Sequence, residues 1–75
     1  MNQAIIKQLL ARAQGYVTQG ERHVARQREI IAEKQRHGYD AAMSMELLKT
    51  FEQSLALHRA DRDQLIKEAS KASPH

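Results

Sequence analysis

The feature that most restricts the fold of this chain is a line of branched apolar side chains spaced seven residues apart. The line consists of Leu10, Val17, Val24 and Ile31. Seven residues make nearly two turns of an α-helix, so these side chains lie on one side of a single helix. A second line runs beside it through Leu9, Tyr16, His23 and Ile30. The two lines predict a long amphipathic helix over about residues 3–36.

The second half of the chain contains two further lines with the same spacing, and they predict a second long helix over about residues 41–71. The members of one line are Ala41, Leu48, Leu55, Arg62 and Ala69, and those of the other are Ser44, Phe51, His58, Leu65 and Ala72, with Met45, Leu47 and Ile66 widening the stripe. Both lines are apolar near the start of this helix and polar in the middle, at His58 and Arg62. Beyond that interruption Leu65 restores the apolar stripe.

Residues 37–40 are expected to form a tight turn between the two helices. Gly38 can adopt the left-handed backbone conformation that commonly ends a helix. Asp40 can cap the second helix, and Ser44, one turn later, is the alternative start. So short a connection returns the chain antiparallel to itself. The predicted fold is therefore all-α, a single domain over residues 1–75 that forms an antiparallel helical hairpin.

Two glycines leave an alternative open for the first helix. Residues 18–21 have the Thr-x-x-Glu form of a capping box, and Gly15 and Gly20 each cost a helix interior about 1 kcal/mol relative to alanine. The helix could therefore break near residues 15–20. The apolar line crosses this region without a change of phase, which favours one continuous helix. With the turn at Gly38, residues whose numbers add to about 76 should lie level, so Gly20 would allow Leu55 to approach closely.

The small size of the chain favours self-association. A chain of 75 residues buries only about 60% of the surface that it exposes when unfolded. It has no cysteine, so neither disulfides nor thiolate zinc sites can add stability. A two-helix hairpin also covers only one side of each helix. The apolar residues left in need of cover include Leu9, Tyr16, Ile30, Met43 and Leu47.

We therefore expect a homodimer in which two hairpins form a coiled-coil-like four-helix bundle. A helical partner protein is the alternative source of cover. The residues expected in the core and interface are Leu10, Val17, Val24, Ile31, Leu48, Phe51, Leu55 and Leu65. Val24→Asp or Phe51→Asp should abolish folding and association together.

Three polar residues, His23, His58 and Arg62, lie on or beside the stripes and can be interpreted in two ways. His58 and Asp61, three residues apart, could be metal ligands or an acid–base pair, but two ligands at this spacing are a weak signal. The three polar residues could instead form a polar layer that sets the register of the helices. The lack of a third and a fourth ligand favours the layer. A zinc site formed by His23 and His58 across a dimer interface is a further hypothesis, although we expect neither metal nor cofactor.

The first half of the chain is basic and suggests nucleic acid as a second class of partner. Residues 2–37 contain seven Lys or Arg against three Glu, whereas residues 40–71 contain five against six acidic residues. The candidate contacts are Arg12, Arg22, Arg26 and Arg28. Glutamates interleave with these arginines, and a nucleic-acid surface is usually more densely basic. A solvated charged face is therefore the favoured interpretation.

The sequence contains no motif that indicates an enzyme or a membrane protein. It has no nucleophile–base arrangement, no glycine-rich phosphate loop and no dinucleotide fingerprint. No apolar run approaches the ~20 residues of a membrane span, and the first residues do not form a secretory signal. We expect a non-enzymatic cytoplasmic protein.

Four segments of the chain resemble a group of short bacterial helical proteins. The group shares the pattern ERHxARQRxII…GxD…LLxxFE…LHxxDRDxL, which here falls on Glu21–Ile31, Gly38–Asp40, Leu47–Glu52 and Leu57–Leu65. The resemblance covers about residues 20–66 and implies a bacterial, cytoplasmic, helical protein. No function is established for that group, so the resemblance implies none for this chain.

Overall fold

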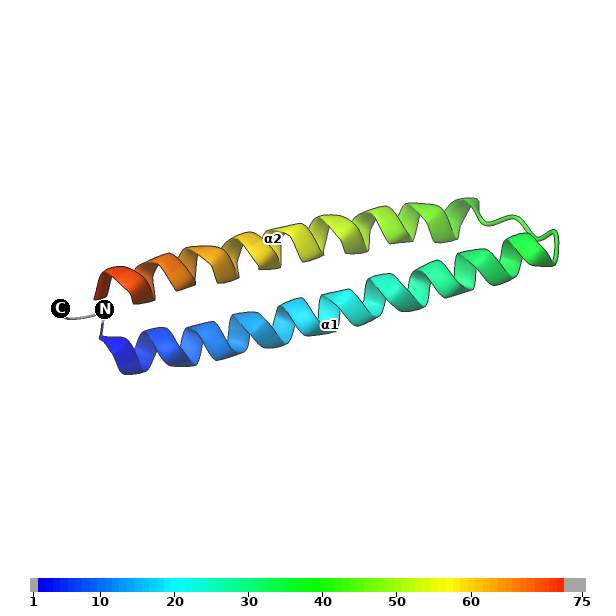
Figure 1. The fold of residues 1–75 in the computed structure, drawn as a ribbon. Coiled ribbons are helices and arrows are strands. Elements are labelled where there is room, and N and C mark those ends of the chain that lie inside the picture. The colour runs from blue at the N-terminus through cyan, green and yellow to red at the C-terminus, as the bar shows by residue number, and fades with distance from the viewer. Residues whose placement is uncertain (1, 73–75) are drawn as a thin grey trace.

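The computed structural model describes residues 2–72, which form two helices joined by a short turn (Figure 1). Helix α1 spans Gln3–Arg36 and helix α2 spans Ala42–Ala72. The two helices lie side by side in opposite directions, so the start of α1 and the end of α2 are at the same end of the molecule (Figure 1). The molecule measures 59 Å by 16 Å by 14 Å. The predicted antiparallel helical hairpin is confirmed.

Helix α1 is continuous through both of its glycines, so the alternative of a break near residues 15–20 is wrong. The two glycines have different surroundings. A Cβ atom built on Gly20 would lie 3.1 Å from Cδ1 of Leu55, whereas one built on Gly15 would have nothing within 4 Å. Gly20 thus lies where α2 approaches α1 closely, beside Leu55 as predicted, and Gly15 lies on the outer surface.

The end of α1 is fixed by hydrogen bonds around Gly38. This glycine has a φ of 72°, the only positive φ in residues 2–72. Its N–H donates to the carbonyl of Gln35 at 3.2 Å, and the N–H of Tyr39 donates to the carbonyl of Lys34 at 2.8 Å. These two bonds form a Schellman motif, which satisfies carbonyls at the helix end and turns the chain away from the helix axis.

The start of α2 is fixed by Asp40. Its Oδ1 accepts a hydrogen bond from the N–H of Ala42 at 2.9 Å, which satisfies one of the free donors at the start of a helix. The alternative start at Ser44 is wrong, because that residue lies inside α2. The helix begins one residue later than predicted, so the connection consists of residues 37–41.

The two helices meet in a narrow seam. In α2 the buried and half-buried residues all belong to the two predicted lines; they are Ser44, Leu48, Phe51, Leu55, His58, Arg62, Leu65 and Ala69. In α1 the line from Leu10 to Ile31 enters the seam together with Ile6, Ala13, Gly20, Gln27 and Lys34. The neighbouring line differs, because Tyr16 and His23 are exposed and only Leu9 and Ile30 are half-buried. This line forms one edge of the seam instead of its centre.

The seam buries little apolar surface for a structure of this length. Its best-packed cluster consists of Val17, Val24 and Leu55, with Leu48 and Phe51 against it. Within the described residues, no side chain is less than 2% exposed. A single small core of this kind contributes only a few kcal/mol to the free energy of unfolding. The hairpin alone therefore has a marginal core.

Candidate interaction surface

The two edges of the seam differ in their chemistry. We define the ion-pair edge by Glu21, Arg28, Glu52 and Arg59, which line one groove between the helices. We define the aromatic edge by Tyr16, His23, Phe51 and His58, which line a second groove together with Gln19, Gly20 and Ser54. The aromatic edge continues into a third groove that contains Leu9, Arg12, Tyr16, Asp61, Gln64 and Leu65. Each edge contains residues from both helices.

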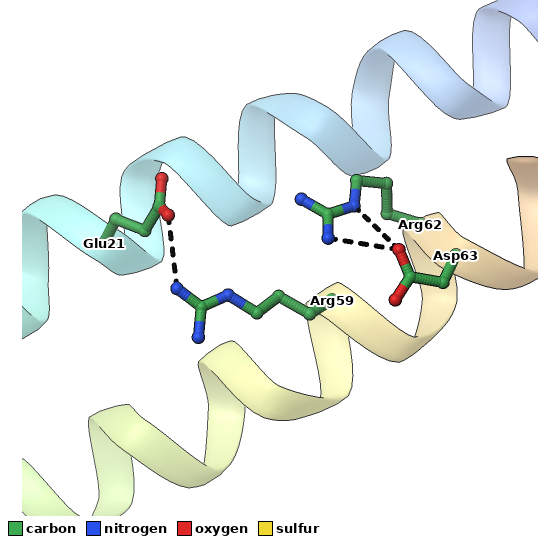
Figure 2. A network of polar contacts seen from close by, with 4 residues as sticks. All are labelled: Glu21, Arg59, Arg62 and Asp63. Atoms are coloured by element: carbon green, nitrogen blue, oxygen red, sulfur yellow. Dashed lines mark hydrogen bonds and ion pairs between the residues drawn. The ribbon is translucent and has the colours of Figure 1, made fainter.

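The ion-pair edge is closed by two contacts between the helices. The Nη2 atom of Arg28 lies 3.0 Å from Oε2 of Glu52, and that of Arg59 lies 3.2 Å from Oε2 of Glu21. Figure 2 shows the side chain of Arg59 extending from α2 to Glu21 on α1. Both pairs are about half exposed, so each contributes at most about 1 kcal/mol to stability. Their main effect is to cover this edge with charged groups.

The aromatic edge is closed by two ring contacts. The rings of Tyr16 and His58 stack with centroids 5.3 Å apart, and those of His23 and Phe51 lie 5.4 Å apart at a tilt of 42°. The partners are seven residues apart on each helix, so the two contacts repeat along the hairpin. Aromatic contacts of this kind contribute about 0.5–1.5 kcal/mol each. Unlike ion pairs, they leave apolar ring surface facing outward.

The apolar surface of the aromatic edge extends onto the outer side of both helices. On α1 it includes Ile5, Leu9, Tyr16 and Ile30, and on α2 it includes Met43, Leu47 and Leu57. Within each helix these residues follow steps of three and four, so they share one side. Met43 is 87% exposed and Leu57 is 72% exposed. We call these seven residues the apolar face.

The ion-pair edge has fewer large exposed apolar residues, although near the turn it continues into a groove lined by Ile31, Met45 and Leu48. Its large exposed apolar residues are Met45 and Ile66, which lie on the same line of α2 as Glu52 and Arg59. The two apolar residues are therefore separated by the charged pairs. Scattered exposed apolar residues are ordinary on protein surfaces, whereas a contiguous patch marks a contact site. The hairpin thus has one face that suits a partner.

The eight residues predicted for the core and interface all lie in the seam within the hairpin. Val17, Val24, Ile31 and Leu55 are buried, and Leu10, Leu48, Phe51 and Leu65 are half-buried. They hold α1 against α2, so the surface available to a partner consists of other residues. Five of the seven residues of the apolar face were expected to need cover. Ile5 and Leu57 were missed.

The three residues of the predicted polar layer do not form one layer. His23 is exposed and lies against Phe51, while His58 is half-buried and lies against Tyr16. Arg62 points toward α1, and its Nε donates to Oδ1 of Asp63 at 3.1 Å (Figure 2).

A polar cluster does exist inside the seam, close to the turn. The Nε2 of Gln27 donates to the carbonyl of Ser44 at 2.8 Å, and the Nζ of Lys34 donates to the hydroxyl of the same serine at 2.7 Å. Gln27 is only 5% exposed. These bonds are specific to one alignment of the helices, so they favour this register over others. In the sequence, the place of Gln27 and Lys34 in the seam is indicated by their spacing, because they follow Gly20 at intervals of seven residues.

The four arginines proposed to contact nucleic acid do not form one surface. Arg26 pairs with Glu29 at 3.2 Å, and Arg28 pairs with Glu52 on the ion-pair edge. Arg12 lines a groove of the aromatic edge, and Arg22 is exposed elsewhere on α1. Two of the four charges are thus already balanced by carboxylates.

No family model, curated protein or solved structure matches this chain. The function of the chain is therefore inferred from the geometry of the hairpin. Residues 2–72 contain no group of three or more His, Asp or Glu side chains that could hold a metal ion. In the same part of the chain, neither helix is long and apolar enough to cross a bilayer.

Proposed function

We propose that this protein is a non-enzymatic helical interaction module that acts by self-association, as a homodimer in which two hairpins form a four-helix bundle. The observation that carries the proposal is the apolar face. It lies on one side of a hairpin whose own seam leaves no side chain fully buried within the described residues. A second hairpin on this face would supply the missing burial.

The dimensions of the hairpin support this proposal. One side of the molecule measures 59 Å by 16 Å, so full overlap would cover on the order of 900 Å² on each copy, compared with about 800 Å² per partner in a standard stable interface. The face combines its seven apolar residues with a few charged ones, among them Arg12 and Asp61. We propose a bacterial, cytoplasmic setting for this dimer, and the basis is the sequence pattern that resembles that of short bacterial helical proteins.

The alternative function, a nucleic-acid-binding regulator, has less support. Arg12, Arg22 and Arg26 share one side of α1, but Arg28 lies on another, and Arg26 and Arg28 are already paired with carboxylates. Binding through these residues would require those pairs to break. It would also require salt-sensitive RNA or DNA binding that weakens with each Arg→Ala substitution.

The proposal is tested by a matched pair of substitutions in α2. Leu57→Lys places a charge on the apolar face, and Ile66→Lys places the same charge on the ion-pair edge. Loss of a buried leucine from both copies should raise the dissociation constant of the dimer by at least about tenfold. Ile66→Lys should change it little. Sedimentation equilibrium measures both constants, and far-ultraviolet circular dichroism at high concentration checks that both variants remain helical.

Equal effects of the two substitutions would contradict the choice of face. A wild-type protein that stays monomeric over the whole concentration range would contradict the proposed function itself. Leu57 is a better probe than Val24 or Phe51, because those two residues belong to the seam and their loss would also unfold the hairpin.

A further inference from the structure

We infer that the partner on the apolar face is a second copy whose turn lies at the same end as that of the first. In this arrangement α1 of each hairpin faces α2 of the other, and Arg12 forms an ion pair with Asp61 of the partner subunit. The inference rests on the proposed self-association and adds the orientation of the two copies and a specific charged contact.

Two hairpins that bury the same face can be related by a two-fold axis in two ways. An axis parallel to the helices puts both turns at the same end and places α1 opposite the partner's α2. An axis perpendicular to the helices, in the plane of the interface, puts the turns at opposite ends and places α1 opposite α1. The two arrangements bury similar areas, so the pattern of residues on the face must decide between them.

In the same-end arrangement, symmetry fixes the level of every residue, that is, its position along the long axis of the dimer. Rotation about an axis parallel to the helices moves no residue along that axis, so α2 of the partner has the level that α2 has within its own hairpin. That level follows from contacts between residues whose numbers add to 74 or 75, namely Gly20 with Leu55, Tyr16 with His58, and His23 with Phe51. Residues of α1 and of the partner's α2 therefore lie level when their numbers add to about 74.

This rule brings chemically matched residues together across the interface. Tyr16 lies level with Leu57 of the partner subunit, and Ile30 lies level with Met43 of the partner subunit. Both pairs join apolar side chains that are exposed or only half-buried in the single hairpin. The same rule places Arg12 level with Asp61 of the partner subunit. This level follows from contacts within one hairpin and does not depend on the pairs across the interface.

Arg12 and Asp61 are suited to such a contact. Both are exposed and line the groove that borders the apolar face. Neither forms an ion pair with any residue of the described range 2–72 of its own hairpin. An exposed arginine and an exposed aspartate at the rim of an apolar face favour an orientation that joins them.

The opposite-end arrangement places like charges together. When two hairpins overlap fully, α1 crosses its symmetry mate near its own midpoint, between residues 19 and 20. Arg12 and Arg26 lie at nearly equal distances on either side of that point and on the same side of α1. Each would therefore face the other across the interface, twice per dimer. Arg26 is already paired with Glu29, so this arrangement offers Arg12 a second guanidinium, whereas the same-end arrangement offers it the carboxylate of Asp61 of the partner subunit.

The distance between labels on the two copies tests the orientation directly. The chain has no cysteine, so Arg36→Cys, at an exposed position near the turn, provides a single attachment site for a spin label. Helix separations of 8–10 Å place the axes of the two α1 helices about 14 Å apart across the same-end bundle, and the two label side chains extend the distance between the labels to about 30 Å. A rise of 1.5 Å per residue from the midpoint of α1 predicts about 50 Å in the opposite-end dimer. Pulsed dipolar electron resonance separates these values.

The outcomes distinguish the inference from the proposed function. A distance near 30 Å supports the same-end dimer. A distance near 50 Å overturns the inference and leaves the proposed self-association in place. The absence of any dipolar distance at high protein concentration overturns both.

A charge exchange tests the ion pair. Arg12→Asp and Asp61→Arg, each alone, place like charges at both copies of the contact, and each should raise the dissociation constant of the dimer by roughly tenfold. When the two variants are mixed, the heterodimer again has opposite charges at both contacts, and the constant should return close to the wild-type value. Within each variant chain the two residues remain alike in charge, so recovery cannot arise inside one hairpin. If the dissociation constant does not recover on mixing, the ion pair is overturned. The matched control is Arg22→Asp, because Arg22 lies off the apolar face and its substitution should leave the constant nearly unchanged.

Discussion

At the scale of single residues, Gly38 shows how one position determines the return of the chain. Its φ of 72° lies in the left-handed region, where a side chain costs about 1–2 kcal/mol. Gly38→Ala should therefore lower the free energy of unfolding by about that amount, although a Cβ at this position would meet nothing within 4 Å. Urea denaturation at a fixed protein concentration measures the change. An unchanged midpoint would contradict this account of the turn.

Single residues also show where sequence information ends. The helix-ending role of Gly38 and the capping role of Asp40 were predictable, because each depends on near neighbours in the chain. The hydrogen bond from Gln27 to the carbonyl of Ser44 joins residues 17 positions apart and requires knowledge of the distance between the helices. The ring contacts of His23 and His58 were unpredictable for the same reason. Sequence spacing alone suggested a shared layer for two histidines that contact different aromatic residues.

At the scale of the elements, substitution by alanine is expected to change the free energy of unfolding by different amounts at the two glycines of α1. Gly15→Ala should raise the free energy of unfolding by about 1 kcal/mol, because it improves helix propensity at an open position. Gly20→Ala should gain clearly less, because the new methyl group would lie 3.1 Å from Leu55 and the leucine must shift. Thermal denaturation of both variants at one protein concentration compares them. A larger gain at Gly20 than at Gly15 would show that α2 does not approach α1 closely there.

The two lines of α2 contain all of its buried and half-buried residues, but Met45, Leu47 and Ile66, which were expected to widen the stripe, are exposed. The periodicity of α1 left two choices. Leu9, Tyr16 and Ile30 are larger than Ala13 and Gly20, yet Ala13, Gly20 and Gln27 enter the seam and the line from Leu9 to Ile30 stays at its edge. The reason is steric. Small residues at the crossing let the helix backbones approach, and the bulky residues are then displaced to the edge. Hydrophobicity counted along the sequence does not include this effect.

At the scale of the whole molecule, the two sides of the hairpin differ in the kind of side chain that they expose to water. Half-exposed ion pairs cover one edge, while the other edge continues into the apolar face. The sequence predicted that apolar side chains would lack cover, because two helices cannot shield two broad stripes. It did not predict that the uncovered residues would gather on one side, since this depends on which edge of the seam each line occupies.

The measurement that tests the central claim most directly is the mass of the protein in solution as a function of concentration. Static light scattering should give about 17 kDa, twice the 8.6 kDa mass of the chain, and the mass should fall toward that of the single chain on dilution, with a parallel loss of thermal stability. A constant mass near 8.6 kDa at high concentration, together with full helicity and a concentration-independent melting temperature, would show that one hairpin needs no partner. The proposed function would then be contradicted.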